Sequence, residues 1–358
     1  MSFNKVSFEE SLEKGVVATG KCVGCGACVV VCPFNCLEYM EGKPRLVKEC
    51  RMCGLCAQVC PQYKWSWSKA EDFVFCRKRK VEEEFGVYRR LVMAKAKNGK
   101  LLKTCQDGGV VTALLLFALD NGLIDSAVVS GISQKKPFYP IPRLAVTSEE
   151  LLECAGTRYC YSPNVLALAE GVKQKKASMA FVGTPCQIHA VRKMQMLGLK
   201  KYVAPVKFLI GLMCSECFSY EGLIEKHIRE TLDINLGDIR KINIKRGKMF
   251  IKTKSEVKII PLTEVKQYAR ESCRFCDDFS SELADISTGG LGLEGWTFVI
   301  IRTEKGEELF SSAEKAGVIK TRNVNEKLSI ISLLQKLSRK KRRNARYHKM
   351  KIYKQPKT

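Results

Sequence analysis

Eight cysteines between residues 22 and 61 constrain this chain more than any other feature. They form two runs of the same spacing, Cys22-x2-Cys25-x2-Cys28-x3-Cys32-Pro33 and Cys50-x2-Cys53-x2-Cys56-x3-Cys60-Pro61. Three thiolates of such a run can bind one cubane iron–sulfur cluster, and the fourth, just before Pro, is free to reach the other cluster. We therefore predict two [4Fe–4S] clusters. The predicted ligands are Cys22, Cys25, Cys28 and Cys60 for one cluster, and Cys50, Cys53, Cys56 and Cys32 for the other.

Structural zinc is the alternative for these cysteines, because paired Cys-x2-Cys motifs also build four-thiolate zinc sites. Two complete four-cysteine runs that both end in Cys-Pro argue against zinc. Residues 15–65 resemble a bacterial-type two-cluster ferredoxin, so we expect a ferredoxin domain over residues 1–68 and a polar connector over 69–86. Trp65 and Trp67 are expected to pack this segment onto the next domain.

Length and composition place the chain among folded, intracellular proteins. Its 358 residues suit one small and one large domain, and a content of 46% hydrophobic residues predicts a packed core. No apolar run approaches the roughly 20 residues that span a bilayer, and the N-terminus has no apolar signal core. The 18 cysteines, grouped at cluster spacings, indicate reduced thiols instead of disulfides. We expect a cytoplasmic, oxygen-sensitive protein.

The formal net charge of +24 needs an anionic partner or ligand to explain it. Eleven Lys and Arg residues, and no acid, lie between Lys336 and Thr358. Nucleic acid, a membrane surface, acidic protein and a polyanionic small molecule all remain open on charge alone. A nucleic-acid-binding protein would need base-stacking aromatics in this region, which offers only Tyr347 and Tyr353, so no nucleic acid is expected. Residues 331–358 predict a docked apolar helix followed by a basic, solvated tail.

The region from residue 87 to 330 reads as a mixed α/β domain, which makes the whole chain α+β. Apolar runs predict strands at 91–96, 126–132, 179–183, 208–213 and 296–303, with alternating hairpin strands over 239–260. Helices are predicted from Val110 to Asn121, with Asp107 as the cap, and from Gln187 to Met196. This order of strand, loop, helix and strand is typical of an α/β unit.

Five of the remaining ten cysteines lie at positions that suit metal binding. Cys186 follows a predicted strand, Cys214 and Cys217 follow the next, and Cys273 and Cys276 form a further Cys-x2-Cys pair. These three pieces can supply four thiolates to a third [4Fe–4S] cluster. Buried free thiols explain them equally well on spacing alone. The other five, Cys36, Cys76, Cys105, Cys154 and Cys160, have no partner at ligand spacing and are expected to pack in the core.

Two glycine-rich segments could approach a ligand. Gly290-x-Gly292-x-x-Gly295 matches the dinucleotide fingerprint, but it precedes a strand, so we interpret it as a chance match or a mobile loop. The segment Gln106-Asp107-Gly108-Gly109 starts a helix, where exposed N–H groups can hold a phosphate or a ring edge; a plain helix cap is the equal alternative. The three histidines show no triad-like or zinc-like spacing, so no hydrolase chemistry is expected.

Five segments in order, TCQDGGVVTALLLFAL, AGTRYCYSP, FVGTPCQIHAVRKM, IGLMCSECFSYEGL and CRFCDDFSSELADISTGGLG, resemble the β subunit of coenzyme F420 hydrogenase/dehydrogenase. The resemblance covers about residues 85–330. It implies a domain that binds FAD, one [4Fe–4S] cluster and coenzyme F420, with Cys186, Cys214, Cys273 and Cys276 as cluster ligands and Cys217 as a spare. The implied FAD contacts are Gln106, Asp107, Gly108, Gly109, Thr112, Thr157, Arg158, Tyr159, Ser162, Gly183, Thr184 and Pro185.

The resemblance also implies a reaction. Reduced F420 would give a hydride to FAD, and single electrons would leave through three [4Fe–4S] clusters to partner subunits, with no side chain acting as a nucleophile. The attached ferredoxin segment is most similar to the electron-input subunits of archaeal membrane-associated reduced-F420 dehydrogenases, so attachment to the cytoplasmic face of a membrane through partners is expected. The alternatives within the family are a hydrogenase, a formate dehydrogenase, or a sulfite- or disulfide-reducing complex.

Overall fold

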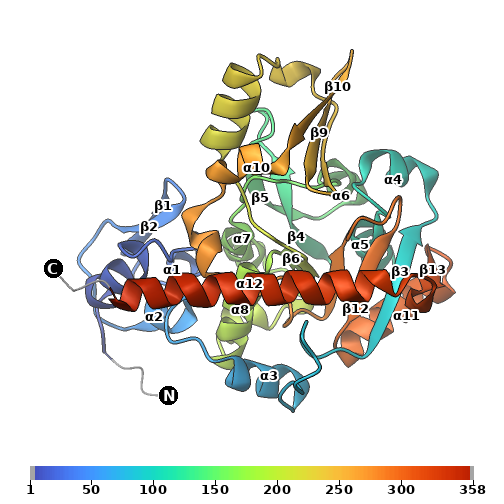
Figure 1. The fold of residues 1–358 in the computed structure, drawn as a ribbon. Coiled ribbons are helices and arrows are strands. Elements are labelled where there is room, and N and C mark those ends of the chain that lie inside the picture. The colour runs from blue at the N-terminus through green and yellow to red at the C-terminus, as the bar shows by residue number, and fades with distance from the viewer. Residues whose placement is uncertain (1–4, 355–358) are drawn as a thin grey trace.

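The computed structural model describes residues 5–354. Its centre is a mixed sheet of eight strands, around which the other elements are arranged (Figure 1). In spatial order the strands are β13 (Ile319–Asn323), β3 (Arg90–Ala96), β12 (Thr297–Ile301), β11 (Ile286–Gly289), β7 (Val206–Leu212), β6 (Met179–Gly183), β4 (Ser126–Ile132) and β5 (Pro140–Ala145).

The strand directions bring several loops to one edge of the sheet. Strands β11, β7, β6 and β4 are mutually parallel, while β12 runs antiparallel to both β11 and β3. Strand β3 therefore points the same way as the parallel group. The carboxyl ends of these five strands meet at one edge, which is where open α/β sheets bind ligands. The predicted mixed α/β class is confirmed.

One face of the sheet is covered by helices α4 (Gly99–Thr104), α5 (Val110–Asp120), α6 (Ser148–Glu153) and α11 (Glu304–Lys315). Helix α5 begins where the sequence predicts, because its run of Val, Leu, Ala and Phe can be buried on this face. Its predicted cap is wrong. Gly109 is the N-cap residue, in a left-handed conformation (φ 68°), and no side chain caps the helix. The Asp107 carboxylate instead lies against Gly290.

The other face is covered by α7 (Ala167–Lys173), α8 (Pro185–Met196) and α9 (Lys200–Val203). Helix α8 starts with Pro185 after a capping box formed by Thr184 and Gln187, which explains why the strand-to-helix connection is so short. Trp65 stacks on His189 of α8 with ring centroids 4.5 Å apart, and Trp67 meets the same ring edge-on at 4.9 Å. The predicted packing role of the two Trp residues is confirmed.

The N-terminal segment comprises η1 (Glu9–Val17), α1 (Ala27–Val30), the hairpin β1 (Leu37–Met40) and β2 (Lys43–Leu46), and α2 (Leu55–Val59). It has a small core of its own around Phe8 and Leu12. Val23, Ala27 and Val59 belong instead to the cluster beneath α8. Helix α3 (Trp67–Phe75) spans residue 68, so the ferredoxin segment continues into the connector without a break.

A small lobe projects from the sheet at the top of Figure 1. Its antiparallel strands are β8 (Lys241–Lys245), β9 (Lys248–Lys252) and β10 (Val257–Pro261), as the alternating sequence of residues 239–260 predicts. Helix η3 (Glu221–Thr231) packs on them through Leu223 and Ile228. Short helical turns complete the fold: η2 (Asn164–Leu166), η4 (Leu236–Asp238), α10 (Leu262–Val265), η5 (Lys266–Tyr268), η6 (Glu271–Phe275) and η7 (Val324–Lys327).

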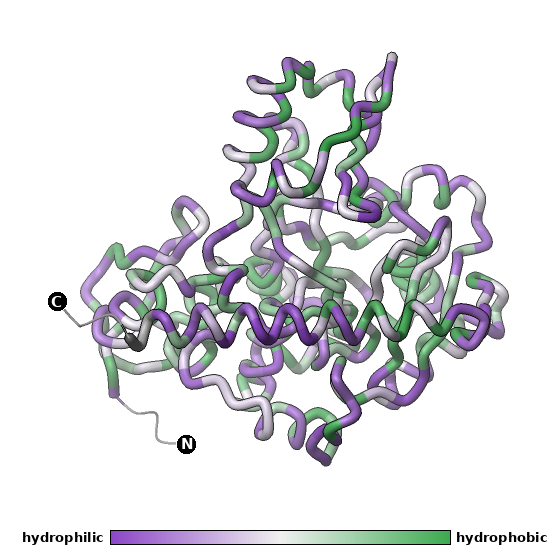
Figure 2. The backbone as a smooth tube through the Cα atoms, in the orientation of Figure 1, coloured by the Kyte–Doolittle hydropathy of each residue, from purple (hydrophilic) through white to green (hydrophobic). Residues whose placement is uncertain are grey.

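The C-terminal segment forms one helix, α12 (Ser329–Lys354), which crosses the molecule (Figure 1). Its apolar start is buried through Ile330 and Leu334, and hydrophilic residues dominate its middle (Figure 2). The predicted basic tail continues this helix through Lys354 and is only partly solvated, because Arg342 pairs with the buried Glu282 and Lys349 with the half-buried Asp277. Residues 355–358 lie outside the described residues. None of the helices in residues 5–354 is both long and apolar enough to span a membrane.

Candidate functional site

The first set of ferredoxin thiols surrounds a small apolar cavity. Its lining includes the predicted ligands Cys22, Cys25, Cys28 and Cys60. Gly26, in a left-handed conformation (φ 81°), begins α1 and lets the chain turn back between Cys25 and Cys28. The fourth thiol comes from the second cysteine run, as the two-cluster rule requires. Burial raises the pKa of Cys60 to about 11, so metal binding would have to displace protons here.

The second set also gathers in space. Burial, together with the nearby thiols of Cys50, Cys53 and Cys32, raises the pKa of Cys56 to about 12. Backbone N–H groups already point at these sulfurs: Phe8 donates to Cys50 Sγ at 3.4 Å and Cys36 to Cys32 Sγ at 3.3 Å. Hydrogen bonds of this kind are typical of cluster sulfurs, and they tune the reduction potential.

The third set forms at the carboxyl edge of the large sheet. Cys186 is in the first turn of α8, directly after β6, and Cys214 follows β7. Cys273 lies within η6, and Cys276 is the residue that ends it. Cys214 Sγ lies 3.8 Å from Cys217 Sγ, and the Cys217 N–H donates to Cys273 Sγ at 3.4 Å. The structure thus brings together all five cysteines that the sequence singled out.

The donors of the three thiol sets are all sulfur, which is the ligand type of iron–sulfur clusters and also of structural zinc. In a four-iron cluster, each of the four thiolates binds a separate iron.

The predicted FAD contacts fall in two groups at the same edge. In the first, Gln106 donates to the Tyr159 hydroxyl at 3.3 Å and also contacts Asn243 of β8. The Ile244 N–H donates to the same hydroxyl at 2.9 Å. Burial raises the pKa of Asp107, although Lys245 and Lys241 lie near enough to oppose the rise. These contacts tie the small lobe to the loop after β3.

Gly108 has a structural role in that loop. Its N–H donates to Thr297 Oγ1 at 3.1 Å, and a Cβ at this position would collide with Ala94 and Thr297. The sequence suggested that N–H groups of this segment could bind a phosphate. The Gly108 N–H already has a protein partner, so it is not open to one. Thr112, one turn into α5, is buried and accepts a weak hydrogen bond from Cys105 at 3.8 Å.

Arg158 is the residue of this group that best fits an anionic cofactor. Its Nε atom is buried with no hydrogen-bond partner, and its Nη1 reaches only the Ala155 carbonyl, at 3.1 Å. Burial lowers the pKa of the guanidinium. The residue as a whole is half-buried, and a cation with a buried, unsatisfied donor favours an anionic partner. The adjacent Thr157 is exposed.

The second group of predicted contacts supports the third thiol set. Thr184 Oγ1 lies 3.3 Å from Cys186 Sγ, next to Pro185. Gly183 packs closely on Gln187, which donates to the Ser162 carbonyl, while the Ser162 hydroxyl contacts Asn164 at 2.7 Å. These polar groups are already paired with protein, so their visible role is to fix the start of α8.

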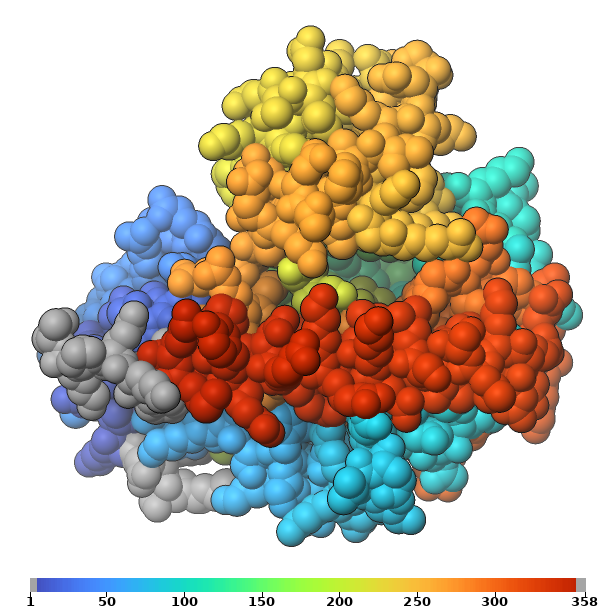
Figure 3. All heavy atoms as spheres, in the orientation of Figure 1, coloured from blue at the N-terminus to red at the C-terminus, as the bar shows by residue number. Residues whose placement is uncertain are grey.

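The surface is hollowed between α12 and the small lobe, with deeper segments visible at its floor (Figure 3). Both rims contact the carboxyl edge. Lys341 of α12 donates to the Cys214 carbonyl at 3.1 Å and also to that of Ser215. Asn243 of the lobe reaches Gln106. Flavin and F420 would therefore have an approach beside the third thiol set.

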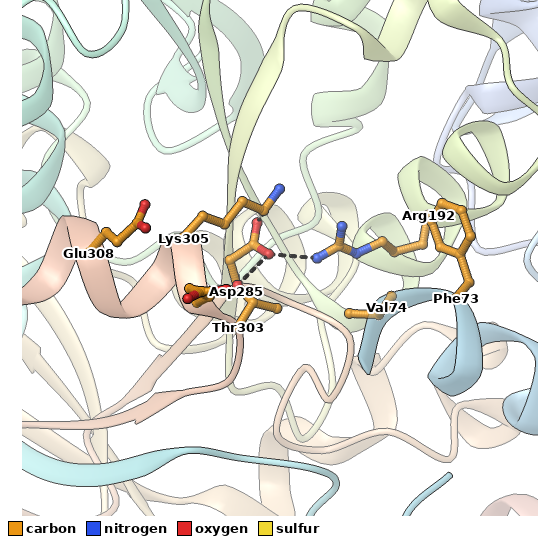
Figure 4. Close-up of a pocket in the computed structure, with 8 residues that line it drawn as sticks. Phe73, Val74, Arg192, Asp285, Thr303, Lys305 and Glu308 are labelled. Carbon is orange, nitrogen blue, oxygen red and sulfur yellow. Dashed lines mark hydrogen bonds and ion pairs between the residues drawn. The ribbon is translucent and has the colours of Figure 1, made fainter. Parts of the chain in front are cut away.

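Two other features do not belong to this site. The Gly290–Gly295 segment does follow a strand, the short β11 that the sequence analysis missed, but it leads into antiparallel β12 and not into a helix. It therefore lacks the dinucleotide-binding context. A second pocket, around Asp285, lies at the amino edge of the sheet (Figure 4). There Arg192, Thr303 and Lys305 already pair with the Asp285 carboxylate.

Sequence reasoning missed two cations at the thiol sets. Arg270 stacks on Tyr161, and Lys341 lies beside Cys214. Arg270 stands three residues before Cys273, which could have drawn attention to it; Lys341 is hidden in a long basic run. Of the five cysteines expected to pack, Cys36, Cys105 and Cys160 are buried and Cys154 is partly buried, but Cys76 is exposed at the end of α3.

Comparison with known proteins identifies the family. Residues 91–169 and 176–327 match the N-terminal and C-terminal parts of the coenzyme F420 hydrogenase/dehydrogenase beta subunit. The coenzyme F420 hydrogenase subunit beta of Methanothermobacter thermautotrophicus is 39% identical over 264 residues, which cover 73% of this chain and 93% of that relative. The chain belongs to the family of coenzyme F420 hydrogenase/dehydrogenase beta subunits. The resemblance seen in the five sequence segments is therefore confirmed.

Further members of this family match more of the chain or its fold. A component of the F420H2 dehydrogenase of Methanosarcina mazei is 32% identical over 303 residues, covering 82% of this chain and 83% of that protein. A solved chain of the F420-reducing [NiFe] hydrogenase complex from Methanosarcina barkeri aligns with a TM-score of 0.70 and 35% identity, over 74% of this chain and 92% of that one. Residues 16–38 match a 4Fe–4S binding domain.

Proposed function

We propose that this chain oxidises reduced coenzyme F420 by hydride transfer to FAD and delivers the electrons, one at a time, through three [4Fe–4S] clusters to partner subunits. The observation that carries the proposal is the position of the third thiol set. Cys186, Cys214, Cys273 and Cys276 lie at the carboxyl edge beside the predicted flavin loops, and Cys186 is also near Cys25 of the ferredoxin segment. FAD would supply the conversion between two-electron and one-electron transfer.

The protein's own residues would position these groups and exclude water. Arg158 would pair with the flavin diphosphate, and the Gln106–Tyr159–Asn243 contacts would hold the lobe against the loop after β3. Helix α8 would carry the Cys186 thiolate on a rigid support. We assign no nucleophile or general acid–base residue, because a hydride transfer between two bound cofactors needs orientation above all.

Anaerobic cofactor analysis tests the proposal. Protein purified without oxygen should contain one FAD and about 12 Fe per chain, as three four-iron clusters require. It should also regenerate oxidised F420 from reduced F420 when given an artificial electron acceptor. Absence of flavin would refute the proposal, and about 8 Fe would remove the Cys186 cluster from it.

The partner complex defines the alternatives within the family. A hydrogenase, a formate dehydrogenase and a sulfite- or disulfide-reducing complex would share the flavin half-reaction and differ only in the subunit that receives or supplies electrons. Identifying the subunits that co-purify with this chain under anaerobic conditions separates these from a reduced-F420 dehydrogenase.

A further inference from the structure

Arg270 lies between the third thiol set and the first ferredoxin set. It is the N-cap residue of η6, and its backbone N–H donates to the Cys217 carbonyl at 2.9 Å. Its guanidinium stacks on the Tyr161 ring, with the central carbon 4.1 Å from the ring centroid. The backbone thus belongs to the third set, while the side chain points toward the ferredoxin segment.

On the ferredoxin side, the guanidinium reaches the loop that carries the first thiols. Arg270 Nη1 donates to the Val23 carbonyl at 2.8 Å, between Cys22 and Cys25. The Nη2 atom would lie 2.7 Å from a Cβ at Gly24, so this glycine (φ 65°) leaves room for it. Val23 directly follows Cys22 in the chain, so the hydrogen bond to the Val23 carbonyl places the cation beside this predicted ligand.

On the other side, the same cation acts on the third set. Arg270 lies three residues before the predicted ligand Cys273, and its backbone N–H donates to the Cys217 carbonyl at 2.9 Å. Tyr161, on which Arg270 stacks, has its hydroxyl 4.0 Å from Cys186 Sγ. None of the ion pairs among residues 5–354 includes Arg270. Its charge therefore remains available to the thiolates.

We propose that Arg270 is a positioning residue shared by two clusters: it fixes the Cys186 site against the Cys22–Cys25–Cys28–Cys60 site and stabilises the reduced form of both. This inference rests on the proposed function. Reduction adds one negative charge to a buried site, so a nearby cation makes reduction more favourable and raises the potential. Because it acts on both sites, Arg270 raises the two potentials together and preserves the driving force between them.

The same contacts set the order of the relay. With clusters bound, one electron would pass from the Cys186 site to the Cys22 site, which oxidises the first and reduces the second, with no proton transfer and no bond broken. Lys193 of α8 holds these sites together, because it donates to the carbonyls of Cys60 and Tyr63 at 2.8 and 2.7 Å. The next step leads to the second ferredoxin set, since Cys28 lies near Cys56. The Cys50–Cys53–Cys56–Cys32 site is then the exit.

Lys341 provides a matched control, because it serves one site only. Its Nζ donates to the carbonyls of Cys214 and Ser215, and the thiols near its charge are those of Cys276, Cys214, Cys273 and Cys217. All of these thiols belong to the third set. A neutral residue at position 341 should therefore change the reduction potential of one cluster. A neutral residue at position 270 should change the potentials of two.

The test is an anaerobic redox titration of the full chain, followed by electron paramagnetic resonance. Signals are assigned with Cys22→Ser, Cys53→Ser and Cys276→Ser, one variant for each cluster. In Arg270→Gln, the midpoint potentials of the Cys22 and Cys186 clusters should fall while that of the Cys53 cluster stays. In Lys341→Gln, only the midpoint potential of the Cys186 cluster should fall. Arg270→Lys keeps the charge and should recover most of both potentials.

The outcomes separate the inference from the proposed function. Wild-type protein with about 8 Fe and no signal lost in Cys276→Ser would refute the third cluster itself. If all three clusters are present, the inference fails when Arg270→Gln shifts only one potential, or none, or shifts the Cys53 cluster equally. It also fails if Arg270→Gln loses a cluster that Arg270→Lys does not restore, because the charge would then not be what matters.

Discussion

Five thiols gather at the third site, although a four-iron cluster binds only four. Cys217 is buried, and its N–H donates to Cys273 Sγ while its thiol contacts Cys214 Sγ at 3.8 Å. This is the pattern of a residue that supports a ligand through its backbone. The side chain itself then contributes packing, and the backbone hydrogen bond tunes the neighbouring sulfur.

Serine at position 217 should therefore leave the cluster in place, since the backbone N–H is unchanged. We expect Cys217→Ser to retain about 12 Fe per chain, and Cys276→Ser to lose about one cluster's iron. Anaerobic iron and sulfide analysis of both variants, purified alongside wild type, makes the measurement. Equal iron loss in the two variants would make Cys217 a ligand.

Asp285 holds the amino edge of the sheet together. It is fully buried and accepts from the Leu209 N–H at 2.7 Å, from Arg192 at 2.8 Å and from Thr303 at 2.9 Å. Burial works to raise its pKa, but Arg192 and Lys305 outweigh burial and the pKa is lowered. The folded state thus prefers the ionised carboxylate, and this preference adds stability above about pH 4, the pKa of an unfolded Asp.

Asparagine at position 285 should destabilise the protein by roughly 3–5 kcal/mol, because it leaves the buried Arg192 without its counter-ion. Thermal unfolding followed by circular dichroism should show a lower Tm at pH 7. The difference from wild type should begin to shrink as the pH falls below about 4, where the carboxylate of the unfolded chain takes up a proton, and should be lost as the pH falls through the lowered pKa of the folded state. Asp238→Asn, which removes an exposed pair with Lys254, should cost less than about 1 kcal/mol. A pH-independent difference would contradict this account.

Among the secondary-structure elements, the sequence predicted best the strands that form because their apolar side chains are buried. The strands at 126–132 and 179–183 coincide with β4 and β6, because both are apolar runs with a paired strand on either side. Strands β11 and β13 were missed, since their sequences ISTG and IKTRN carry little apolar signal. Their pairing with β12 and β3 stabilises them, and no local pattern records that.

The candidate site was predictable in its ligands but not in its supporting contacts. Cysteine spacing identified the two ferredoxin sets, since short loops bring nearby residues together. For the third set, spacing left buried free thiols equally open, and the resemblance to the family supplied the predicted ligands. The contact of Gln106 with Asn243 joins residues 137 positions apart, and Arg270 meets Val23 across 247 positions. Neither contact leaves a trace in spacing or periodicity. Helix α12 was misjudged for the same reason, because its acidic partners lie elsewhere in the chain.

Helix α12 offers a prediction that separates its two sides. Leu334 is fully buried and Leu333 is 37% exposed. We expect Leu334→Ala to cost roughly 2–5 kcal/mol, and Leu333→Ala much less, because only the first opens a cavity. Lys341, farther along the helix, covers the Cys214 loop. Leu334→Ala should therefore also speed iron loss to a chelator, measured by absorbance, whereas equal rates in the two variants would show that α12 does not protect the third site.

At the scale of the whole molecule, the net charge of +24 divides into two parts. Some cations serve the fold: Arg339 pairs with Glu84, Arg342 with Glu282 and Lys349 with Asp277. The rest give the surface a positive field, which attracts anions and accelerates their binding. The resemblance to F420-linked proteins supplies such an anion, since coenzyme F420 carries a phosphodiester and a carboxylate-rich tail.

The rate of F420 oxidation should therefore depend on salt. We expect kcat/KM for reduced F420 to fall steadily as ionic strength rises from about 0.01 to 0.5 M, while kcat changes little, because screening weakens the encounter and not the hydride transfer. The artificial acceptor should be uncharged and saturating, so that salt affects only the binding of reduced F420 and not that of the acceptor. A neutral solute at matched viscosity controls for slower diffusion. If kcat/KM does not respond to salt, the positive surface plays no part in F420 capture, and its partner must be sought among the subunits that receive the electrons.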